Sequence, residues 1–373
     1  IRNLKPDSID DIIALVALYR PGPIGSGMID DFINRKHGRT EVRYLHPLLE
    51  PILKDTHGVI LYQEQVMQIA KDLAGFTLGE ADNLRKAMGK KNASILEKNR
   101  QLFLDGCKLN HIPENLAEEI FVLIEYFAGY GFNKSHSAAY GLLAYQTAYL
   151  KANFKEEFMA SLLSSVIMSF DKVNQYIAEC KKIGIEVLPP DVNESKEDFT
   201  VRDGTIRFGL SAIKNIGYNS IISIIEERKN GPFLDIDDFC SRVDLRATGK
   251  KVIENLVYAG AFSSLGYARK GLLRAIDTAY DKGASYQRDK DSSQVSLFDL
   301  DVVEMGSQTP TRVEAEEFEP SELLAREKEM LGFYVSSHPL ELYEELRGRK
   351  GFSSIIDIDE DDDNRRIAVR GII

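Results

Sequence analysis

The sequence predicts a mainly α-helical protein made of several parts, and three observations support this fold class. Apolar residues recur at helical spacing through most of residues 1–188. The stretch DFTVRDGTIRFGL alternates apolar and polar residues around Asp203-Gly204, a pattern typical of a β-hairpin. Residues 288–320 are polar and acidic with few large apolar side chains, a composition typical of a linker.

The first region contains a series of helix signals. In SIDDIIALVALY, Ser8 is a suitable N-cap and the apolar residues have helical spacing, before the chain breaks at Arg20-Pro21-Gly22-Pro23. Thr77-x-x-Glu80 is a capping box at the start of a helix that should end near residue 88. Further helices are expected at about 26–36, 62–73, 92–110 and 113–127, from about 135, and beyond 155. The proline pair in LPPD closes this helical region at about residue 190.

Beyond residue 190 the pattern is less regular. Short helices should follow the hairpin up to about residue 288, and one more is expected near 321–331. An aspartate run, IDIDEDDDN, then precedes RRIAVRGII, which has the pattern of a strand at the end of the chain. The opening residues, IRNLKPDSIDD, lack the regions of a signal peptide and look like mid-chain sequence. We therefore expect the chain to be a fragment of a longer protein.

Composition excludes several classes of protein. No apolar run approaches the length that a membrane-spanning helix needs, so no membrane partner is expected. The three cysteines, Cys107, Cys180 and Cys240, are far apart, and the six histidines form no cluster at ligand spacing. Neither a disulfide framework nor a zinc site is therefore predicted, and a reducing cytoplasm is the expected location.

The net charge of -11 is unevenly distributed. Residues 291–373 hold 9 Lys and Arg against 20 Asp and Glu, which accounts for the whole excess. The preceding residues are balanced, so their cations are able to gather on one face. The acidity of the whole chain therefore does not exclude a nucleic-acid partner.

The stretch FNKSHSAAYGLLAYQTAYLK combines a polar helix start with unusually small residues. If the helix starts near Ser135, these small residues share one face: Ser137, Gly141, Ala144 and Ala148. The free N–H groups of a helix N-terminus favour an anion, and Lys134 and His136 add cationic donors there. A phosphate would suit this position. The alternative is that the polar start is only a cap and the small face packs against another helix.

Further basic residues lie at breaks and helix ends of the same region. Arg20 lies at the Pro-Gly-Pro break, Arg35-Lys36-His37 closes one helix, and Arg85, Lys86, Lys90 and Lys91 crowd the end of another. Each of these cations alone is explained by a helix C-terminus, which it stabilises by about 0.3–1 kcal/mol. Together they suggest a site for a polyphosphate or a nucleic-acid backbone.

Several of these motifs resemble one known family. ALYRPGP, FINRKHG, GVILYQEQVMQIA, LRKAMGKK and GYGFNKSHSAAYGLLAYQTAYLKANF are similar to the fingers domain of the bacterial C-family replicative DNA polymerases, the alpha subunits of DNA polymerase III. In that family the fingers receive the incoming dNTP and the templating base. The resemblance implies that Lys134 and His136 form its Lys-x-His motif and that Arg20 belongs to its Arg-Pro-Gly-Pro motif. Arg85 and Lys86 are less secure candidates for the same nucleotide site.

The resemblance also implies what this chain lacks. Phosphoryl transfer in such an enzyme needs clustered carboxylates that hold two Mg²⁺ ions, and in the family these aspartates belong to the palm, before residue 1 here. We expect no catalytic residue, no metal and no activity in the fragment alone, although the full-length enzyme is a DNA-directed DNA polymerase that uses Mg²⁺. The run IDIDEDDDN is interpreted as a solvated loop.

A second nucleic-acid signal lies in FGLSAIKNIGYNSIISIIEER, which resembles a helix-hairpin-helix motif. In its turn, Lys214, Asn215 and Gly217 would bring backbone N–H groups close to a phosphate of duplex DNA. KKVIENLVYAGAFSSLG looks like a degenerate second copy, with Lys250 and Lys251 as candidate DNA contacts and Gly260 at the matching turn. The alternative is an ordinary corner between two helices.

A third signal lies in the linker. Gln294, Leu297 and Phe298 resemble the family's Gln-x-x-Leu-Phe pentapeptide, which binds the sliding clamp. Burial of the two large side chains would contribute about 1.5–3 kcal/mol each, so binding of about micromolar strength is expected. The alternative is a chance pentapeptide that docks on its own protein.

The resemblance assigns a role to each part of the chain. Residues 1–190 would be the fingers, 191–287 a hairpin with tandem helix-hairpin-helix motifs, 288–320 the acidic linker with the clamp-binding motif, and 321–373 a connecting helix with the truncated start of an OB-fold. The implied partners are primer-template DNA, dNTP, the sliding clamp and, through regions outside the chain, other replicase subunits. The alternative functions are a non-catalytic DNA-binding scaffold and a translesion relative of the same polymerase.

Overall fold

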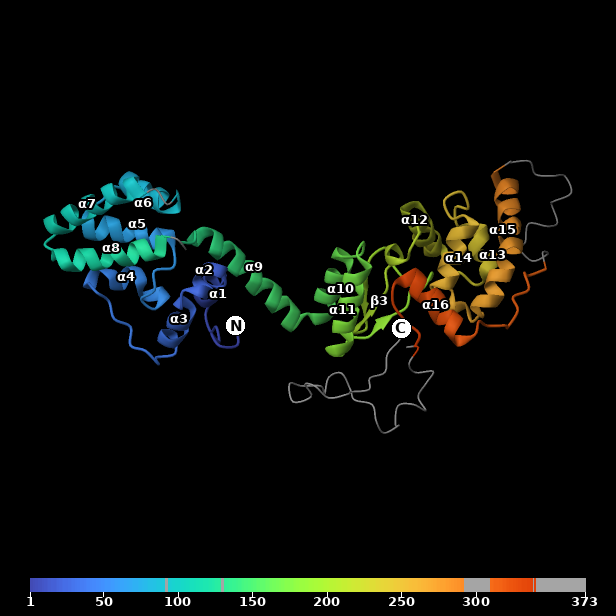
Figure 1. The fold of residues 1–373 in the computed structure, drawn as a ribbon. Helices are drawn as coiled ribbons and strands as arrows, with labels where there is room; N and C mark the ends of the chain where they lie inside the picture. The colour runs from blue at the N-terminus through green and yellow to red at the C-terminus, as the bar shows by residue number, and fades with distance from the viewer. Residues whose placement is uncertain (91–92, 129–130, 292–308, 338, 340–373) are drawn as a thin grey trace, which may run out of the picture. The chain divides into compact units, whose positions relative to one another are not determined.

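The computed structural model describes residues 1–90, 93–128, 131–291, 309–337 and 339. The described chain is mainly helical, as predicted, with one small sheet (Figure 1). It divides into two compact units, Ile1–Asn153 and Phe154–Ile373, and each has its own apolar core. Within the described residues, every helix is too short or too polar to cross a membrane.

The regular secondary structure in the described part of unit 1 consists of helices joined by loops. Its elements are α1 (Ile9–Leu18), α2 (Pro21–Gly25), α3 (Met28–Lys36), η1 (Pro47–Leu49), α4 (Glu50–Leu53), η2 (Lys54–Thr56), α5 (Gln63–Ala74), α6 (Leu78–Lys90), α7 (Ala93–Leu109), α8 (Glu114–Ala128) and α9 (Lys134–Asn153). Both predicted helix starts are confirmed: Ser8 and Asp11 cap α1 reciprocally, and Thr77 and Glu80 do the same for α6. Phe103 of α7 and Phe121 of α8 lie in the core of unit 1, each with an exposure of 0%.

The small face of α9 packs closely over only half of its length. A Cβ added to Gly141 would lie 2.8 Å from a side-chain carbon of Ile13 and 3.0 Å from its Cα, and the Ser137 hydroxyl donates to the Ile13 carbonyl at 2.5 Å. Ala144 and Ala148, on the same predicted face, are exposed. Helix α1 therefore needs the small residues only near the start of α9.

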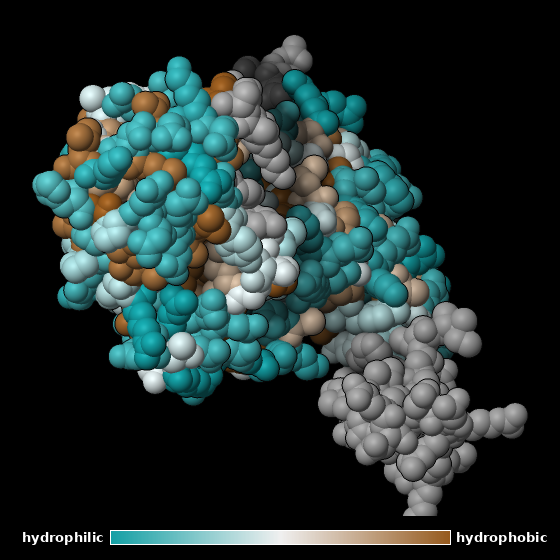
Figure 2. Space-filling model, turned by 60° about the vertical axis from the view of Figure 1, so that its left-hand side comes forward, coloured by the Kyte–Doolittle hydropathy of each residue, from teal (hydrophilic) through white to brown (hydrophobic). Residues whose placement is uncertain are grey.

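Apolar side chains also occur on the surface of unit 1. Val122 and Tyr126 of α8 and Leu143 of α9 are about half exposed, at 51%, 55% and 55%. Figure 2 shows apolar patches between hydrophilic ones on one face of the molecule.

Unit 2 combines a three-stranded sheet with helices. Its elements are α10 (Lys155–Ser165), α11 (Phe170–Lys182), β1 (Val187–Leu188), β2 (Thr200–Arg202), β3 (Thr205–Arg207), η3 (Leu210–Ala212), α12 (Tyr218–Glu227), η4 (Arg228–Asn230), α13 (Ile236–Arg242), α14 (Lys250–Tyr258), η5 (Ser263–Leu265), α15 (Arg269–Asp291) and α16 (Pro320–Leu331). The strand order is β1-β3-β2, with β1 parallel and β2 antiparallel to β3. Asp203 and Gly204 both have positive φ, as a two-residue hairpin turn requires, so the predicted hairpin is confirmed.

Three features of unit 2 differ from the sequence prediction. Strand β1 was not predicted, because two residues beside a proline pair give no alternating pattern. Helix α15 has 23 residues where short helices were expected. Residues 309–319, expected to be part of the linker, lie against α13 and α15: Thr311 N–H donates to Asp237 at 2.7 Å, and Arg274 pairs with Glu314 at 2.6 Å.

The two units also divide the helical region differently from the predicted domains. Helices α10 and α11 were expected to belong with residues 1–190, but their apolar faces pack onto the sheet. Met159 and Val173 share the buried core of unit 2 with Phe208 of the segment after β3. The functional assignment of the domains stays a prediction. Three predicted features lie outside the described residues: the pentapeptide expected to bind the clamp, the aspartate run and the terminal strand.

Candidate nucleotide and DNA interfaces

Arg20 lies where the chain breaks between α1 and α2. Its guanidinium carbon is 4.4 Å from the centre of the Phe132 ring, and its Nε–H donates to the Ala17 carbonyl at 2.7 Å. Burial lowers the pKa of Arg20 from its ordinary value, yet a guanidinium remains charged at neutral pH. The fold therefore holds a half-buried cation over an aromatic face in unit 1.

Phe132 is itself fixed by the start of α5. The Gln63 N–H donates to the Phe132 carbonyl at 2.9 Å, and the Gln63 side chain donates to the Gly131 carbonyl at 3.3 Å. Tyr62 pairs with Phe132 as an isolated parallel bridge. These contacts join residues about 70 positions apart and fix the segment that leads into α9.

Two of the predicted cations at the start of α9 join this group. The Lys134 ammonium is 5.5 Å from the centre of the Tyr62 ring, and the His136 ring lies 5.6 Å from Phe132 and 4.7 Å from Tyr140. Arg20, Lys134 and His136 thus lie against the Tyr62–Phe132 pair. We call these five residues the Phe132 cluster. Sequence reasoning missed these two aromatic residues, although Phe132 stands two positions before Lys134 in the quoted motif.

The N-terminus of α9 differs from the prediction in one respect. Its amides were expected to be free for an anion, but Asn133 accepts from the His136 N–H at 2.8 Å and Glu64 accepts from the Lys134 N–H at 2.9 Å. Two of the exposed backbone donors are therefore already satisfied by the protein. An anion at this site would be bound mainly by the side chains of Arg20, Lys134 and His136.

Arg85 and Lys86 occupy different surroundings. An Arg85 guanidinium nitrogen lies 3.3 Å from the Gln63 side-chain oxygen, which connects it to the Phe132 cluster, while other nitrogens pair with Asp82 at 2.8 Å. Lys86 also pairs with Asp82, at 2.6 Å, and lines a cavity of about 470 Å³ between α6 and α7 together with Lys98. Of the two residues, Arg85 is thus the better placed to contribute to a nucleotide site at the Phe132 cluster.

The Arg35-Lys36-His37 group stabilises the fold instead of offering free cations. The Lys36 ammonium is buried and contacts Asp7 and Asp11, each at 2.8 Å. Burial alone would raise the pKa of Asp11, but hydrogen bonds from Lys36, from the Asp7 N–H and from Ser8 lower it to about 2. For this group, the interpretation as a structural cation is the better one.

The predicted helix-hairpin-helix turn has donors directed to solvent. Asn215 has φ 60° and Gly217 is the N-cap of α12. Among the described residues, the N–H groups of Asn215, Ile216 and Gly217 have no acceptor. A Cβ on Gly217 would meet nothing within 4 Å, so the space beside it is open to a phosphate.

Lys214 plays a different part from the one expected. Its N–H donates to the Met330 carbonyl at 3.0 Å, so this amide is not available to DNA. Its ammonium lies 4.6 Å from the centre of the Phe170 ring. The available backbone donors of the turn begin at Asn215.

The predicted second copy of the motif has a glycine on either side of α14. Gly260 follows α14 and lies against the side chain of Arg269, which a Cβ would approach to 2.4 Å. Gly249 is the N-cap of α14, with φ -66° and ψ 166°, close to the φ -80° and ψ 151° of Gly217. Gly249 therefore precedes its helix as Gly217 does, whereas Gly260 follows that helix, and the second copy of the motif stays a prediction.

Lys250 and Lys251 are the first two residues of α14, directly after the turn at Gly249. Lys250 pairs with Asp277 at 2.7 Å and with Asp281 at 3.2 Å, and Lys251 pairs with Glu254 at 2.8 Å. These carboxylates raise the pKa of both lysines and compete with any DNA phosphate. The positive charge beside the second turn is thus more fully neutralised by carboxylates than the positive charge beside the first turn.

Metal chemistry finds no support within the described residues. No group of three or more His, Cys, Asp or Glu side chains there could hold a metal ion, and Cys107, Cys180 and Cys240 are buried free thiols. The described side chains do not fit a two-magnesium centre, so we derive no catalytic step through one.

Comparison with known proteins shows which proteins this chain resembles. Residues 1–111 match the family described as the bacterial DNA polymerase III alpha subunit finger domain, and residues 184–272 match the helix-hairpin-helix motif. The DNA polymerase III subunit alpha of Pseudomonas aeruginosa is 45% identical over 99% of this chain, and that of Bacillus subtilis is 46% identical over 95%. The matched regions are 33% and 31% of those proteins, so the chain spans about a third of their length. The resemblance predicted from the motifs is thereby confirmed, and the chain corresponds to a segment of the DNA polymerase III alpha subunits that carries their finger domain and a helix-hairpin-helix motif.

Proposed function

We propose that this chain is the part of a bacterial DNA-directed DNA polymerase that binds the incoming dNTP and the duplex behind it. One observation carries the proposal: Arg20 and Tyr62, both far from residues 132–136 in the sequence, lie against this segment, with Arg20 over the Phe132 ring beside His136 and Lys134 over the Tyr62 ring. Cations beside aromatic faces suit a nucleoside triphosphate, because the cations pair with phosphate oxygens and the rings offer a stacking surface.

The contribution of these residues is to bind and orient. Arg20 presents a planar set of donors that fits phosphate oxygens, and Lys134 supplies a point charge. The Gln63 and Glu64 contacts hold the start of α9, so the cations keep their positions before the nucleotide arrives. In a complete polymerase, Mg²⁺ on carboxylates outside the described residues would supply the chemistry of phosphoryl transfer.

Two other functions remain as alternatives. A non-catalytic DNA-binding scaffold would share the turns at Gly217 and Gly249 but would not need the Phe132 cluster. A translesion relative of the polymerase would share both the two turns and the Phe132 cluster. Insertion kinetics in the full-length protein separate the first alternative from the proposal. We infer a cytoplasmic location, because the proposed function acts on bacterial DNA.

The turn at Gly217 gives a testable expectation for duplex binding. Gly217→Val places a branched side chain in the open space beside the free N–H groups, where a phosphate would lie. We expect duplex affinity to fall equally for all sequences and the salt dependence to flatten by about one phosphate contact. Fluorescence anisotropy at several salt concentrations measures both quantities.

A matched control is available for this experiment. Gly79→Val also introduces a side chain into open space, on α6 of unit 1, and should leave duplex affinity unchanged. A loss confined to one DNA sequence, or no loss in a folded Gly217→Val variant, contradicts the assignment.

We also propose that the pentapeptide at 294–298 binds a sliding clamp. Its support is the motif alone, since it lies outside the described residues. Leu297→Ala with Phe298→Ala should weaken clamp binding about 100-fold, because each side chain contributes about 1.5 kcal/mol or more. Long-tract synthesis should collapse while short-range synthesis persists, because the tether is lost.

Calorimetry with purified clamp tests this proposal. Val295→Ala with Ser296→Ala alters only the two unspecified positions of the motif and should leave the affinity unchanged. Equal affinity for the wild-type chain and the Leu297/Phe298 variant would remove the motif from the account. A large drop in melting temperature would show that the two side chains belong to a folded core.

A further inference from the structure

The end of α16 lies directly against the first DNA-binding turn. The Met330 carbonyl, in the last turn of α16, accepts the Lys214 N–H at 3.0 Å. Helix ends leave carbonyls without an intrahelical partner, and here the turn supplies the missing donor. The same bond removes Lys214 from the set of free amides and leaves Asn215 as the first donor toward solvent.

Helix α11 completes this contact. Asn174 donates to the Gly332 carbonyl at 3.0 Å, and Phe170 lies under both the Lys214 ammonium and Gly332. Gly332 has φ 86°, the left-handed conformation that ends α16, and a Cβ there would lie 2.7 Å from the Phe170 ring. Three segments far apart in the sequence therefore converge on the base of the turn.

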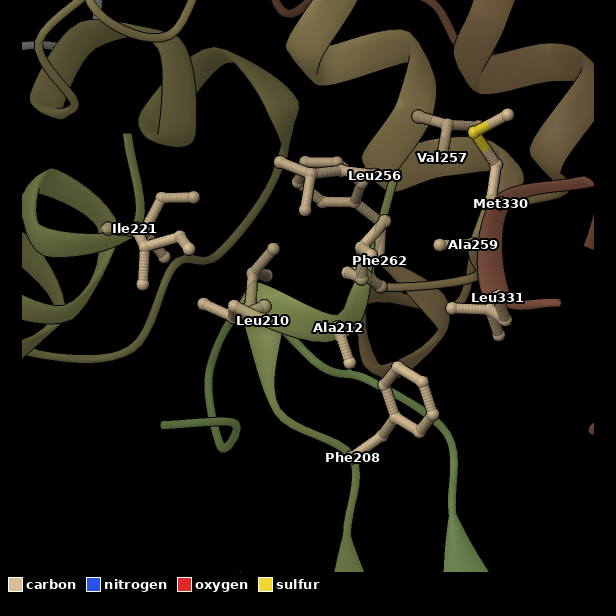
Figure 3. Packing of buried hydrophobic residues seen from close by; sticks show 14 of the residues in the cluster. Phe208, Leu210, Ala212, Ile221, Leu256, Val257, Ala259, Phe262, Met330 and Leu331 are labelled. Carbon is tan, nitrogen blue, oxygen red and sulfur yellow. The ribbon is translucent and has the colours of Figure 1, made fainter. Parts of the chain in front are cut away.

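The apolar core extends beneath the same turn. Met330 and Leu331 are buried with Ala212 and Phe208, which lie in the segment that leads into the turn. Figure 3 shows Met330 and Leu331 of α16 next to Val257 and Ala259, in the same group of buried side chains as Phe262. The end of α16 is thus part of the core on which the turn rests.

A buried carboxylate locks the chain after α16. Glu327 has an exposure of 0%, accepts from the Ser336 N–H at 2.7 Å and also contacts the Val335 N–H and the Ser336 hydroxyl. Arg269 of α15 pairs with it at 3.2 Å. A buried charge is retained at low cost only when it is fully partnered, as this one is.

Residues 309–319, which we call the strap, hold α16 from its other end. Gly271 of α15 allows the strap to pass: a Cβ there would lie 1.9 Å from the Glu314 carbonyl oxygen. Glu317 accepts from the N–H groups of Arg269 and Lys270 at 2.8 and 3.2 Å. The strap therefore contacts the backbone of α15 closely, in addition to the surface ion pairs between their side chains.

We propose that the strap and α16 form a brace that holds the turn at residues 213–217 in its DNA-binding conformation. The proposal rests on the proposed duplex-binding function of that turn. The brace lies beyond residues 184–272, where the helix-hairpin-helix match ends. Met330 and Glu327 are positioning residues, since they act through Lys214 and the core and not through contact with DNA.

Two substitutions in the full chain loosen the brace at separate points. Glu327→Gln removes the charge that Arg269 and residues 335–336 require, and Gly271→Ala displaces the strap from α15. Both should speed hydrogen exchange of the Lys214 amide and weaken duplex binding, each about tenfold. Glu322→Gln is the matched control and should change neither, since Glu322 lies on the same helix and, among the described residues, pairs only with Arg326, at 3.7 Å.

The two measurements separate the brace from the DNA-binding assignment. An unchanged Lys214 exchange rate in folded variants with a released strap overturns the brace, and so does faster exchange with unaltered duplex affinity. If the wild-type chain itself fails to bind duplex, the proposed function of the turn is wrong, and the exchange rates still decide whether the brace supports the turn.

Discussion

Lys134→Ala, in a full-length polymerase that contains this chain, is expected to lower kcat/KM for the incoming nucleotide about 10- to 100-fold. A hydrogen bond to a charged group contributes about 1.5–3 kcal/mol, and the effect appears here because the ammonium has no ion pair with any described residue. Duplex affinity should stay nearly unchanged, since the turns at Gly217 and Gly249 belong to unit 2. Single-nucleotide insertion kinetics on a primer-template measure the effect.

A lysine elsewhere in unit 1 controls for the loss of one positive charge. Lys71 is exposed in the last turn of α5, and Lys71→Ala should leave nucleotide kinetics within about twofold of the wild type, an effect of less than half a kcal/mol. Kinetics within the same range for Lys134→Ala would show that Lys134 does not serve the triphosphate.

Lys36→Met is expected to destabilise unit 1 by about 3–5 kcal/mol, because it leaves Asp11 as a buried charge without its partner. Asp11 is 4% exposed and also caps α1, the helix that packs on Gly141 and leads to Arg20. Loss of this pair should therefore weaken the Phe132 cluster as well as the fold. Urea denaturation at pH 7 measures the change in free energy of unfolding.

The same pair predicts how stability depends on pH. Since the pKa of Asp11 is lowered to about 2, its contribution is present above the unfolded value of about 3.9 and is lost as the pH falls through 2. The pKa of Lys36 is raised, so its contribution is lost only when the pH rises above about 10.4. Wild-type stability should fall between pH 4 and 2, and Lys36→Met should show a smaller fall. An equal fall in both proteins would assign the acid sensitivity to other carboxylates.

The sequence predicted those features that depend on neighbours along the chain. The capping boxes at Ser8 and Thr77 and the hairpin at Asp203-Gly204 each need only a few adjacent residues, and all three are present. The start of α9 was also identified, because its cap, Asn133, lies within the motif.

The features that the sequence did not reveal depend on residues far away. Lys36 and Lys134 look alike in sequence, yet one is buried between two aspartates and the other lies beside an aromatic ring. Only the fold decides which lysine has a carboxylate partner. Likewise, the composition of residues 309–319 alone indicates a linker. The contacts that fix this stretch come from Gly271 and Arg274 of α15, and nothing within the stretch reveals them.

Photo-crosslinking tests the central claim, that the Phe132 cluster binds the triphosphate, most directly. The full-length polymerase with primer-template is irradiated with a dNTP that carries an aryl azide on its γ-phosphate, and the labelled peptides are mapped. The account predicts labels at residues 132–136 and around Arg20 that unmodified dNTP suppresses. Suppressible labels confined to the cavity of Lys86 and Lys98, with none in the Phe132 cluster, would contradict it.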